Sequence, residues 1–242
     1  MKAVAALILM TVVVCTAGCT KDDPNNGGNN NGGNGGNSLN GHEYVDLGLP
    51  SGTLWATCNV GADTPEVYGD YFAWGEIQPK GKYERENYKW ANYVVGDEIQ
   101  WTKYCGTDNL ISLQPEDDAA TVNWGSGWCM PTSSQWVELL GNTTSVWTTQ
   151  NDVNGWRFTG PNGNVVFLPA SSDCWYTESL PTNPKDLGER GNYWANSLIL
   201  EHADEVEVAS HFDFDSSSYQ MDKAEGGDRH IGASVRPVCS SH

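Results

Sequence analysis

Few residues in this sequence have the types and spacing that chemistry requires. His211, Asp213 and Asp215 alternate along a candidate strand, so they would share one face, where imidazole and carboxylate groups suit a hard cation. The alternative, which we favour, is a solvated strand face. The five histidines are scattered, and no two cysteines have the CxxC spacing of a zinc site. We expect no bound metal and no cofactor.

Paired carboxylates are the second candidate. Asp117-Asp118 and Glu76 are the groups that a glycosidase would use. However, Asp117-Asp118 directly precede Ala119-Ala120, where carboxylates would meet the positive end of a helix dipole. The sequence has no nucleophile elbow, P-loop, dinucleotide-binding glycine motif or His-Glu-x-x-His motif. We therefore expect no catalytic residues and no enzymatic activity.

Aromatic side chains in predicted loops are stronger candidates, because Trp and Tyr rings can stack on sugar rings. The residues that we select as ligand contacts are Trp90, Trp101, Trp124, Trp175 and Tyr176. The alternative for each is that it holds a long loop against the core. Grouping of Trp90, Trp101 and Trp175 on one exposed face would favour binding, whereas scattering into the core would favour a structural role.

Composition and charge exclude several classes of protein. The chain has 242 residues and a formal net charge of −18, from 13 Lys+Arg and 31 Asp+Glu. Nucleic-acid binding needs a basic surface, so we expect no nucleic-acid partner. The 11 Trp, 10 Tyr and 5 Phe supply the core that disordered chains lack.

The first 18 residues have the features of a lipoprotein signal peptide. Lys2 precedes an apolar run over residues 3–14, which is too short to span a bilayer. Small residues then precede Cys19, as a lipoprotein signal peptidase requires. The alternative is an ordinary secretory signal. An acylated Cys19, carrying palmitate or similar chains, would anchor the protein stably in outer-membrane lipid.

The residues after Cys19 predict a location and a tether. Lys21, Asp22 and Asp23 resemble the export signal that sends lipoproteins of Bacteroidetes-type bacteria to the outer face of the outer membrane. Residues 25–37 are all Asn or Gly, so residues 19–41 are expected to form a flexible tether with a reach of roughly 25–30 Å. The predicted location is the cell surface, lipid-anchored to the outer membrane.

The rest of the chain, residues 42–240, reads as one α+β domain of short, mostly antiparallel strands with one clear helix and long loops. An opening hairpin is expected over residues 44–60, and a long aromatic loop over 79–104. The helix is expected over about 131–141, capped by Thr132 and Gln135 and ended by Gly141. Further strands are expected at 146–149, 156–159, 165–168, 193–200, 206–214 and 231–238, with turns at Asn154-Gly155 and Asn162-Gly163.

Five cysteines remain in this domain: Cys58, Cys105, Cys129, Cys174 and Cys239. A disulfide between Cys58 and Cys239 would join the first strands to the last. Free buried thiols that pack as small hydrophobic groups are the alternative.

Ordered sequence blocks resemble the Fibrobacter succinogenes major paralogous domain. They are the segments 43–62, 68–76, 117–120, 128–132, 164–170, 193–197 and 234–238, which together span most of the domain. Cys129 departs from the family, which usually has Arg there. The resemblance implies a C-type-lectin-like fold shared with formylglycine-generating enzymes, with Trp55, Trp74, Trp128 and Trp194 in the core.

The resemblance gives a location and fold more than a function. The redox cysteine pair of formylglycine-generating enzymes is missing, since only Cys239 lies in that region, and the sugar-coordinating motifs of calcium-dependent lectins are absent. Two hypotheses follow. The first is a non-catalytic surface module for binding or adhesion to a glycan or to a host or partner protein. The second is a structural or assembly component of the outer envelope with no soluble ligand.

Overall fold

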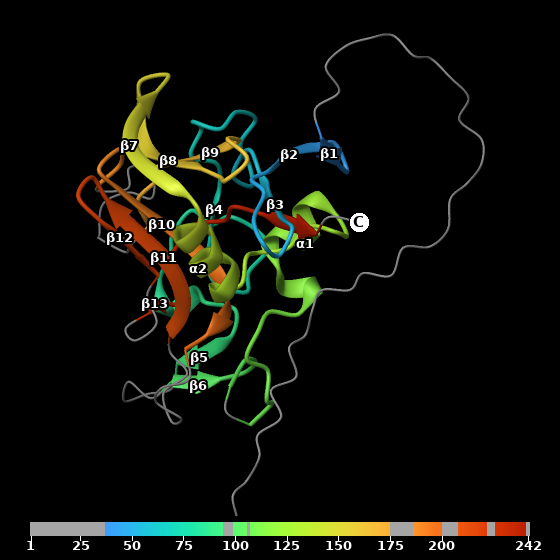
Figure 1. Ribbon diagram of the computed structural model, residues 1–242. Coiled ribbons are helices and arrows are strands. Elements are labelled where there is room, and N and C mark those ends of the chain that lie inside the picture. The colour runs from blue at the N-terminus through green and yellow to red at the C-terminus, as the bar shows by residue number, and fades with distance from the viewer. Residues whose placement is uncertain are drawn as a thin grey trace, which may run out of the picture. The chain divides into compact units, whose positions relative to one another are not determined.

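The computed structural model describes residues 37–93, 99–105, 107–174, 186–199, 208–221 and 226–240 (Figure 1). Within them the chain is mostly β-structure with two α-helices, which confirms a mostly antiparallel fold with few helices. The named strands make ten antiparallel pairs and one parallel pair, and antiparallel neighbours need no long crossover helix between them.

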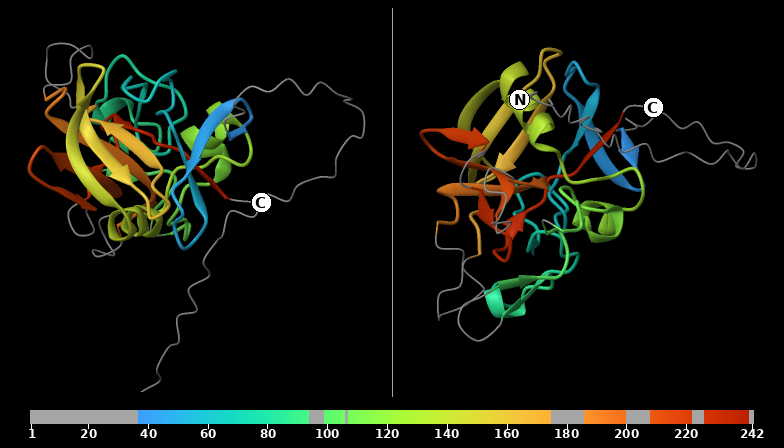
Figure 2. Two further views of the ribbon diagram at one scale, coloured as in Figure 1. Left: turned by 45° about the horizontal axis from the view of Figure 1, so that its top comes forward. Right: turned by 90° about the horizontal axis from the view of Figure 1, so that it is seen from below.

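The first sheet has the order β1-β2-β3-β15 and brings together the two ends of the described chain. Its strands are β1 (Ser38–Leu39), β2 (His42–Asp46), β3 (Thr53–Ala56) and β15 (Val238–Ser240). The pairing of β2 with β3 confirms the predicted opening hairpin, although β3 ends at Ala56 rather than at residue 60. Figure 1 shows this sheet beside α1 (Ala119–Trp124), at the opposite end of the domain from β5 (Ala91–Tyr93) and β6 (Ile99–Trp101), and the second view in Figure 2 agrees.

The second sheet has the order β12-β11-β10-β14-β4, and β13 also pairs with β11. Its strands are β4 (Tyr71–Phe72), β10 (Arg190–Leu198), β11 (Val208–Asp215), β12 (Tyr219–Met221), β13 (Gly227–Asp228) and β14 (Ala233–Ser234). The single strand predicted over 231–238 is therefore wrong. The chain leaves β14 at Val235 and joins the first sheet as β15, and Pro237, which has no N–H to donate, lies at that junction.

Arg236 explains how this junction is held. The side chain is fully buried, and its guanidinium donates to Asn59 Oδ1 at 2.8 Å and to the carbonyls of Ala56, Thr57 and Phe167. All four acceptors are neutral oxygens, and burial lowers the pKa of Arg236. One side chain thus joins the end of β3 to the third sheet, because a buried charge is tolerated only when hydrogen bonds satisfy it.

The third sheet contains β7 (Thr144–Gln150), β8 (Val153–Thr159) and β9 (Val165–Pro169) in that order. The turn predicted at Asn154-Gly155 is wrong, because the turn between β7 and β8 is Asn151-Asp152, and both residues have positive φ. Gly155 lies inside β8 because a Cβ there would come within 2.2 Å of the Leu168 carbonyl oxygen and 2.8 Å of the Phe167 ring. The turn expected at Asn162-Gly163 is confirmed, with Gly163 at φ +86°.

Two helices begin with capped N-termini. In α2 (Ser133–Asn142) the Thr132 hydroxyl accepts from the Gln135 N–H, and the Gln135 side chain accepts in return from the Thr132 N–H, which confirms the predicted capping box. The helix continues through Gly141 to Asn142, so the predicted end is one residue short. The second helix, α1 (Ala119–Trp124), lies outside the prediction of one clear helix, but it begins where the acidic pair predicted a helical turn.

The segment 79–104, predicted as a long loop, contains short regular elements. These are a 3₁₀ turn (Arg85–Asn87) and the hairpin of β5 (Ala91–Tyr93) and β6 (Ile99–Trp101). Its tyrosines do hold it to the core as predicted: Tyr83, Tyr88 and Tyr104 are buried. A second 3₁₀ turn (Pro115–Asp117) follows before α1.

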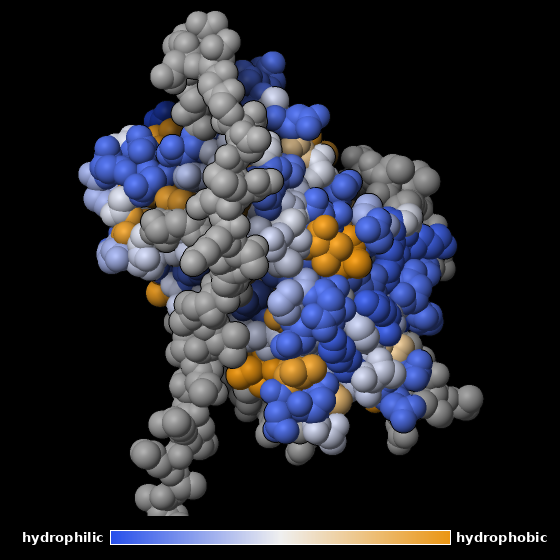
Figure 3. Space-filling model, turned by 90° about the vertical axis from the view of Figure 1, so that its right-hand side faces the viewer, coloured by the Kyte–Doolittle hydropathy of each residue, from blue (hydrophilic) through white to orange (hydrophobic). Residues whose placement is uncertain are grey.

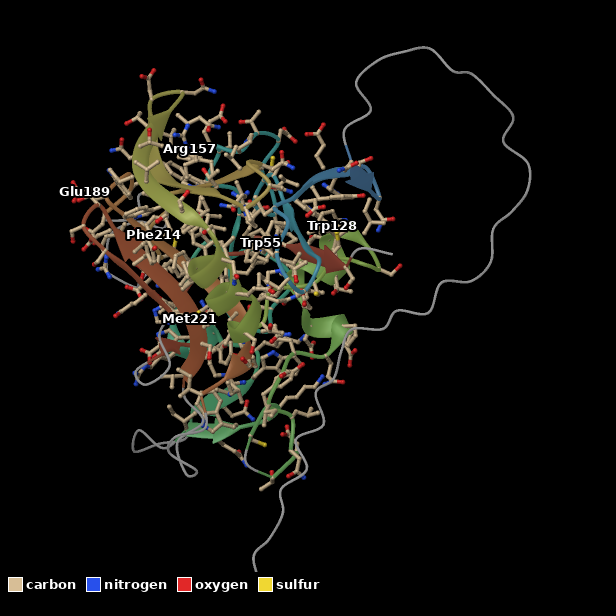
Figure 4. The ribbon with its side chains drawn as sticks, viewed as in Figure 1. Trp55, Trp128, Arg157, Glu189, Phe214 and Met221 are labelled. Atoms are coloured by element: carbon tan, nitrogen blue, oxygen red, sulfur yellow. The ribbon has the colours of Figure 1, made fainter. Side chains whose placement is uncertain are left out.

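The core is aromatic and falls into two main clusters. Trp74, Trp128 and Trp194 belong to the cluster around α1 and β14, and Trp55 belongs to the cluster between α2 and the second and third sheets. All four are at most 1% exposed, which confirms their predicted place in the core. Figure 4 labels Trp55 and Trp128, and also Phe214, which packs against Trp147 of β7 with ring centres 6.2 Å apart.

Candidate functional site

Trp90 lies at the base of the β5–β6 hairpin and is partly buried. Its indole N–H donates to the Gly75 carbonyl at 2.8 Å, so the ring has a fixed orientation. The ammonium groups of Lys89 and Lys103 lie 4.0 and 5.2 Å from the centre of the ring, within cation–π range, and the Tyr104 ring meets it edge-on. We call Lys89, Trp90, Lys103, Tyr104 and Asp117 the Trp90 cluster.

Asp117 is the acidic centre of the Trp90 cluster. Its side chain is 3% exposed and accepts from Lys103 Nζ at 2.5 Å, from Lys89 Nζ at 3.3 Å and from the Tyr104 hydroxyl at 2.7 Å. Burial opposes ionisation of this carboxyl, but the hydrogen bonds from Lys103 and Tyr104 outweigh it and lower the pKa of Asp117. The cluster is therefore a fixed arrangement of charges beside a partly exposed indole.

Trp101 lies on the other face of the same hairpin. Ala91 pairs with Trp101, so these two side chains share a face, whereas Trp90 and Thr102 form the next pair, in which the Thr102 N–H donates to the Trp90 carbonyl at 2.9 Å. Grouping of Trp90 and Trp101 on one exposed face, the arrangement that would favour binding, is therefore not found. Antiparallel pairing itself separates them.

Arg229 holds the face that carries Trp101. The side chain is 1% exposed, and its guanidinium lies 4.4 Å from the centre of the Trp101 ring and 5.0 Å from that of Trp74. It donates to the Tyr88 hydroxyl and to the carbonyls of Lys103 and Tyr104 at 3.0–3.1 Å. Trp101 therefore packs on the buried guanidinium of Arg229. This contact holds the loop against the core, which is the alternative to ligand contact given above for each aromatic residue.

Trp124 is also structural. It is 7% exposed, and His42 stacks on it with ring centres 3.9 Å apart and planes 3° from parallel. The selection of Trp124 as a ligand contact is wrong in this structure, because the first strands of the domain cover its ring. Trp175 and Tyr176 lie outside the described residues, as do Cys19, Lys21, Asp22 and Asp23.

The alternating acidic strand does not present one set of ligands. His211 is buried on β11, with its Nε2 atom 3.8 Å from Asp213 Oδ1. Asp215 instead accepts from the N–H groups of Ser217 and Ser218 in the turn before β12. No group of three or more His, Cys, Asp or Glu residues suited to a metal ion occurs among the described residues.

All five domain cysteines are free thiols, so the predicted disulfide between Cys58 and Cys239 is not formed. Cys239 pairs with Leu54, four positions before Cys58, and Cys58 lies beyond the end of β3, so the two cysteines are not opposite each other in the sheet. Burial raises the pKa of Cys174 to about 12 and that of Cys239 to about 11. Both thiols stay protonated at neutral pH, so they are poor nucleophiles.

Asp118 acts as a structural acid. It is buried, and it accepts from the N–H groups of Ala120 and Thr121 at the start of α1 and from the Met130 N–H at 2.8 Å. Burial raises the pKa of Asp118 to about 6. The carboxylate pair singled out for glycosidase chemistry thus divides into a helix cap, Asp118, and a lysine-paired acid, Asp117.

Sequence reasoning missed the two buried arginines, Arg229 and Arg236, and the role of Lys103. One signal in the sequence could have found them. Basic residues are scarce, since only 13 of 242 residues are Lys or Arg, and a basic residue inside an otherwise apolar run such as 231–238 needs a buried partner. The acceptors that they reach are mostly backbone carbonyls, which have no sequence signature.

No protein-family model, curated protein or solved structure matches this chain. Among the described residues, neither helix has the length and hydrophobicity that a bilayer crossing requires.

Proposed function

We propose that this chain is a non-catalytic, lipid-anchored protein of the outer-membrane surface, and that its domain is a binding or adhesion module. The proposed anchor is acylated Cys19, exported under the signal at Lys21, Asp22 and Asp23, and the proposed fold is the C-type-lectin-like fold of the Fibrobacter succinogenes major paralogous domain. The mostly antiparallel sheets with few helices are compatible with that fold.

The observation that carries the binding proposal is the fixed, partly exposed indole of Trp90. Its N–H is bonded to Gly75 and its ring is in contact with two ammonium groups, so little side-chain entropy is lost when a ligand binds. A sugar ring or an aliphatic side chain of a partner protein can pack on an indole. The position of the β5–β6 hairpin, at the opposite end of the domain from β1, supports its display (Figure 1).

The titratable groups support a non-catalytic role. Cys174 and Cys239 are protonated thiols, Asp118 is a helix cap and Asp117 is paired with two lysines. Asp117 and Asp118 have structural roles and the two thiols are protonated, whereas catalysis would need a group that is free to exchange protons or attack a substrate.

A glycan-array screen tests the binding proposal. The mature chain carrying Cys19→Ser, which has no lipid, is compared with the same chain carrying Trp90→Ala. Saturable binding that Trp90→Ala weakens at least tenfold is the expected result. Trp101→Ala is the control on the opposite face, and it should leave affinity unchanged under conditions where the variant is folded. A partner protein captured by the wild type and lost with Trp90→Ala would identify the protein-binding form of the proposal.

The alternative function is a structural component of the outer envelope. The burial of Trp124 and the placement of Trp101 under Arg229 favour it, because these aromatic rings hold the fold instead of facing solvent. Absence of binding to plant, host and bacterial glycans and to surface proteins would select this alternative.

The anchor has its own test. Mass spectrometry of the mature N-terminus should find Cys19 as the first residue, carrying acyl chains, and Cys19→Ser should release the protein from the membrane fraction. An unmodified N-terminus at another residue would contradict the anchor while leaving the binding test unaffected.

A further inference from the structure

The third sheet ends in a long strand with one neighbour. β7 has seven residues and pairs with β8 alone among the described strands. The register runs without a bulge from Thr144 opposite Thr159 to Gln150 opposite Val153. Figure 1 shows β7 on the outside of this sheet. Its second edge has no strand partner among the described residues.

The turn determines which backbone groups point to that edge. Asn151 and Asp152, with φ of 47° and 66°, form a two-residue turn, so Gln150 and Val153 are a hydrogen-bonded pair. Hydrogen-bonded and non-hydrogen-bonded pairs alternate in an antiparallel ladder. Ser145, Trp147 and Thr149 therefore direct their N–H and C=O groups away from β8, and the described residues supply these groups with no backbone partner.

β7 has none of the features that normally protect an edge. Proteins block such edges with lysine, proline, a bulge or a very short strand. The sequence of β7, TSVWTTQ, contains no charge, glycine or proline. Other edge strands are short, since β1 and β4 have two residues and β12 has three. The carbonyl of Phe167 in β9 already accepts from Arg236. β7 is the long unprotected edge in the described part of the chain.

We propose that β7 pairs antiparallel with β7 of a second copy of this chain, forming a continuous six-stranded sheet across a two-fold axis. The three outward-facing residues are spaced evenly about Trp147. A two-fold axis at Trp147 places Ser145 opposite Thr149 of the other copy, so all outward N–H and C=O groups find partners at once. This inference does not rest on the proposed function.

Charge and side-chain type support a second copy as the partner. Two chains of net charge −18 repel each other, and the neutral β7 permits contact without like charges directly opposite. Val146 is 45% exposed on the outer face and would lie opposite Thr148 of the other copy, a pairing of β-branched residues that suits a sheet. Figure 3 shows one face of the molecule, on which the described residues are mostly hydrophilic and the hydrophobic patches are separate.

A single strand pair buries little area, so the dimer is expected to be weak in solution. Added salt should strengthen it, because salt screens the repulsion between the acidic chains. Sedimentation equilibrium of the mature chain carrying Cys19→Ser, from micromolar to millimolar concentration, measures the dissociation constant at each salt concentration.

Two matched pairs of variants test the edge. Ser145→Pro removes one outward N–H and keeps the bonds to β8, whereas Ser145→Ala removes only the hydroxyl, which lies 3.1 Å from the Tyr219 hydroxyl. Ser145→Pro should raise the dissociation constant at least tenfold, and Ser145→Ala should change it less than twofold. Val146→Lys should raise it several-fold, whereas Val165→Lys, at a similarly exposed valine on β9, should not.

Thermal unfolding of each variant confirms that it is folded. A chain that stays monomeric to millimolar concentration would overturn the proposal. So would a dimer that survives both Ser145→Pro and Val146→Lys, since its interface must then lie elsewhere. Loss of dimer with Ser145→Pro but not with Ser145→Ala supports pairing through the backbone.

Discussion

The β5–β6 segment and the β7–β8–β9 sheet hold their shape by different means. β5 and β6 have three residues each, and the chain around them depends on single side chains, Arg229 and Asp117, that bond to several backbone or charged groups. β7 and β8 have seven residues each and are joined by a continuous ladder. One region relies on a few long-range contacts and the other on many local ones.

The difference predicts how each region responds to change. Loss of one buried side chain in the β5–β6 segment leaves several hydrogen-bond partners unsatisfied at once. One substitution at an exposed position of the β7–β8 ladder removes few contacts and so changes the free energy of unfolding little. A regular ladder has another property, since it leaves an edge with unpaired groups. The first region is therefore sensitive to mutation, and the second is open to association.

The largest effect is expected for Arg229→Met. Removal of the guanidinium leaves the carbonyls of Lys103 and Tyr104 and the Tyr88 hydroxyl without this donor, at a cost of about 3–5 kcal/mol in the free energy of unfolding. Arg157→Met is the matched control on β8, where the side chain is exposed, and it should change stability by less than about 0.5 kcal/mol. Urea unfolding measures both, and equal effects would contradict the contrast between the regions.

Gly155→Ala should have the next largest effect. The new Cβ would lie 2.2 Å from the Leu168 carbonyl oxygen, so β8 and β9 must separate locally, at about 1–3 kcal/mol. Gly81→Ala is the control in the other region, because no atom lies within 4 Å of a Cβ there. Thermal unfolding should show a lower midpoint for Gly155→Ala alone. An unchanged midpoint would mean that the sheet tolerates the added methyl group.

Lys103→Met should have a smaller effect that depends on pH. The pKa of Asp117 lies below its ordinary value of 3.8 in the folded chain, so this carboxylate adds stability above pH 3.8 and loses it as the pH falls through the folded pKa. The variant should lose about 1 kcal/mol at pH 7, and its difference from wild type should shrink below pH 3.8. Lys82→Met, from an exposed pair, is the control. A difference that is constant with pH would show that Asp117 is not the partner involved.

Local signals predicted the regular parts of the fold. The capping box of α2 and the opening hairpin were readable because each depends on residues close in sequence. The core position of the four tryptophans was implied by the resemblance of the sequence blocks that contain them, and burial confirms it. Asn154-Gly155 misled because a glycine is required both in tight turns and where two strands approach closely. The glycine there makes room for Phe167 and forms no turn.

The candidate site was less predictable. Trp90 and Trp101 are both rich in apolar area, and only the strand register places them on opposite faces. Trp124 looked like a loop residue, and the ring that covers it, His42, lies 82 positions earlier (124 − 42). Contacts of this kind depend on the arrangement of distant elements, which one sequence does not specify.

The contacts of the first strands also determine how the domain responds to force. Asn40 donates to the carbonyls of Trp124 and Ser126, and the Trp128 indole donates to the Leu39 carbonyl. A pull applied through residue 37 therefore acts on the bond from the Tyr44 N–H to the Asn37 carbonyl, on these three bonds and on the His42–Trp124 stack. Mechanical unfolding is expected to begin with detachment of β1 from the loop after α1, while β3, held between β2 and β15, yields later.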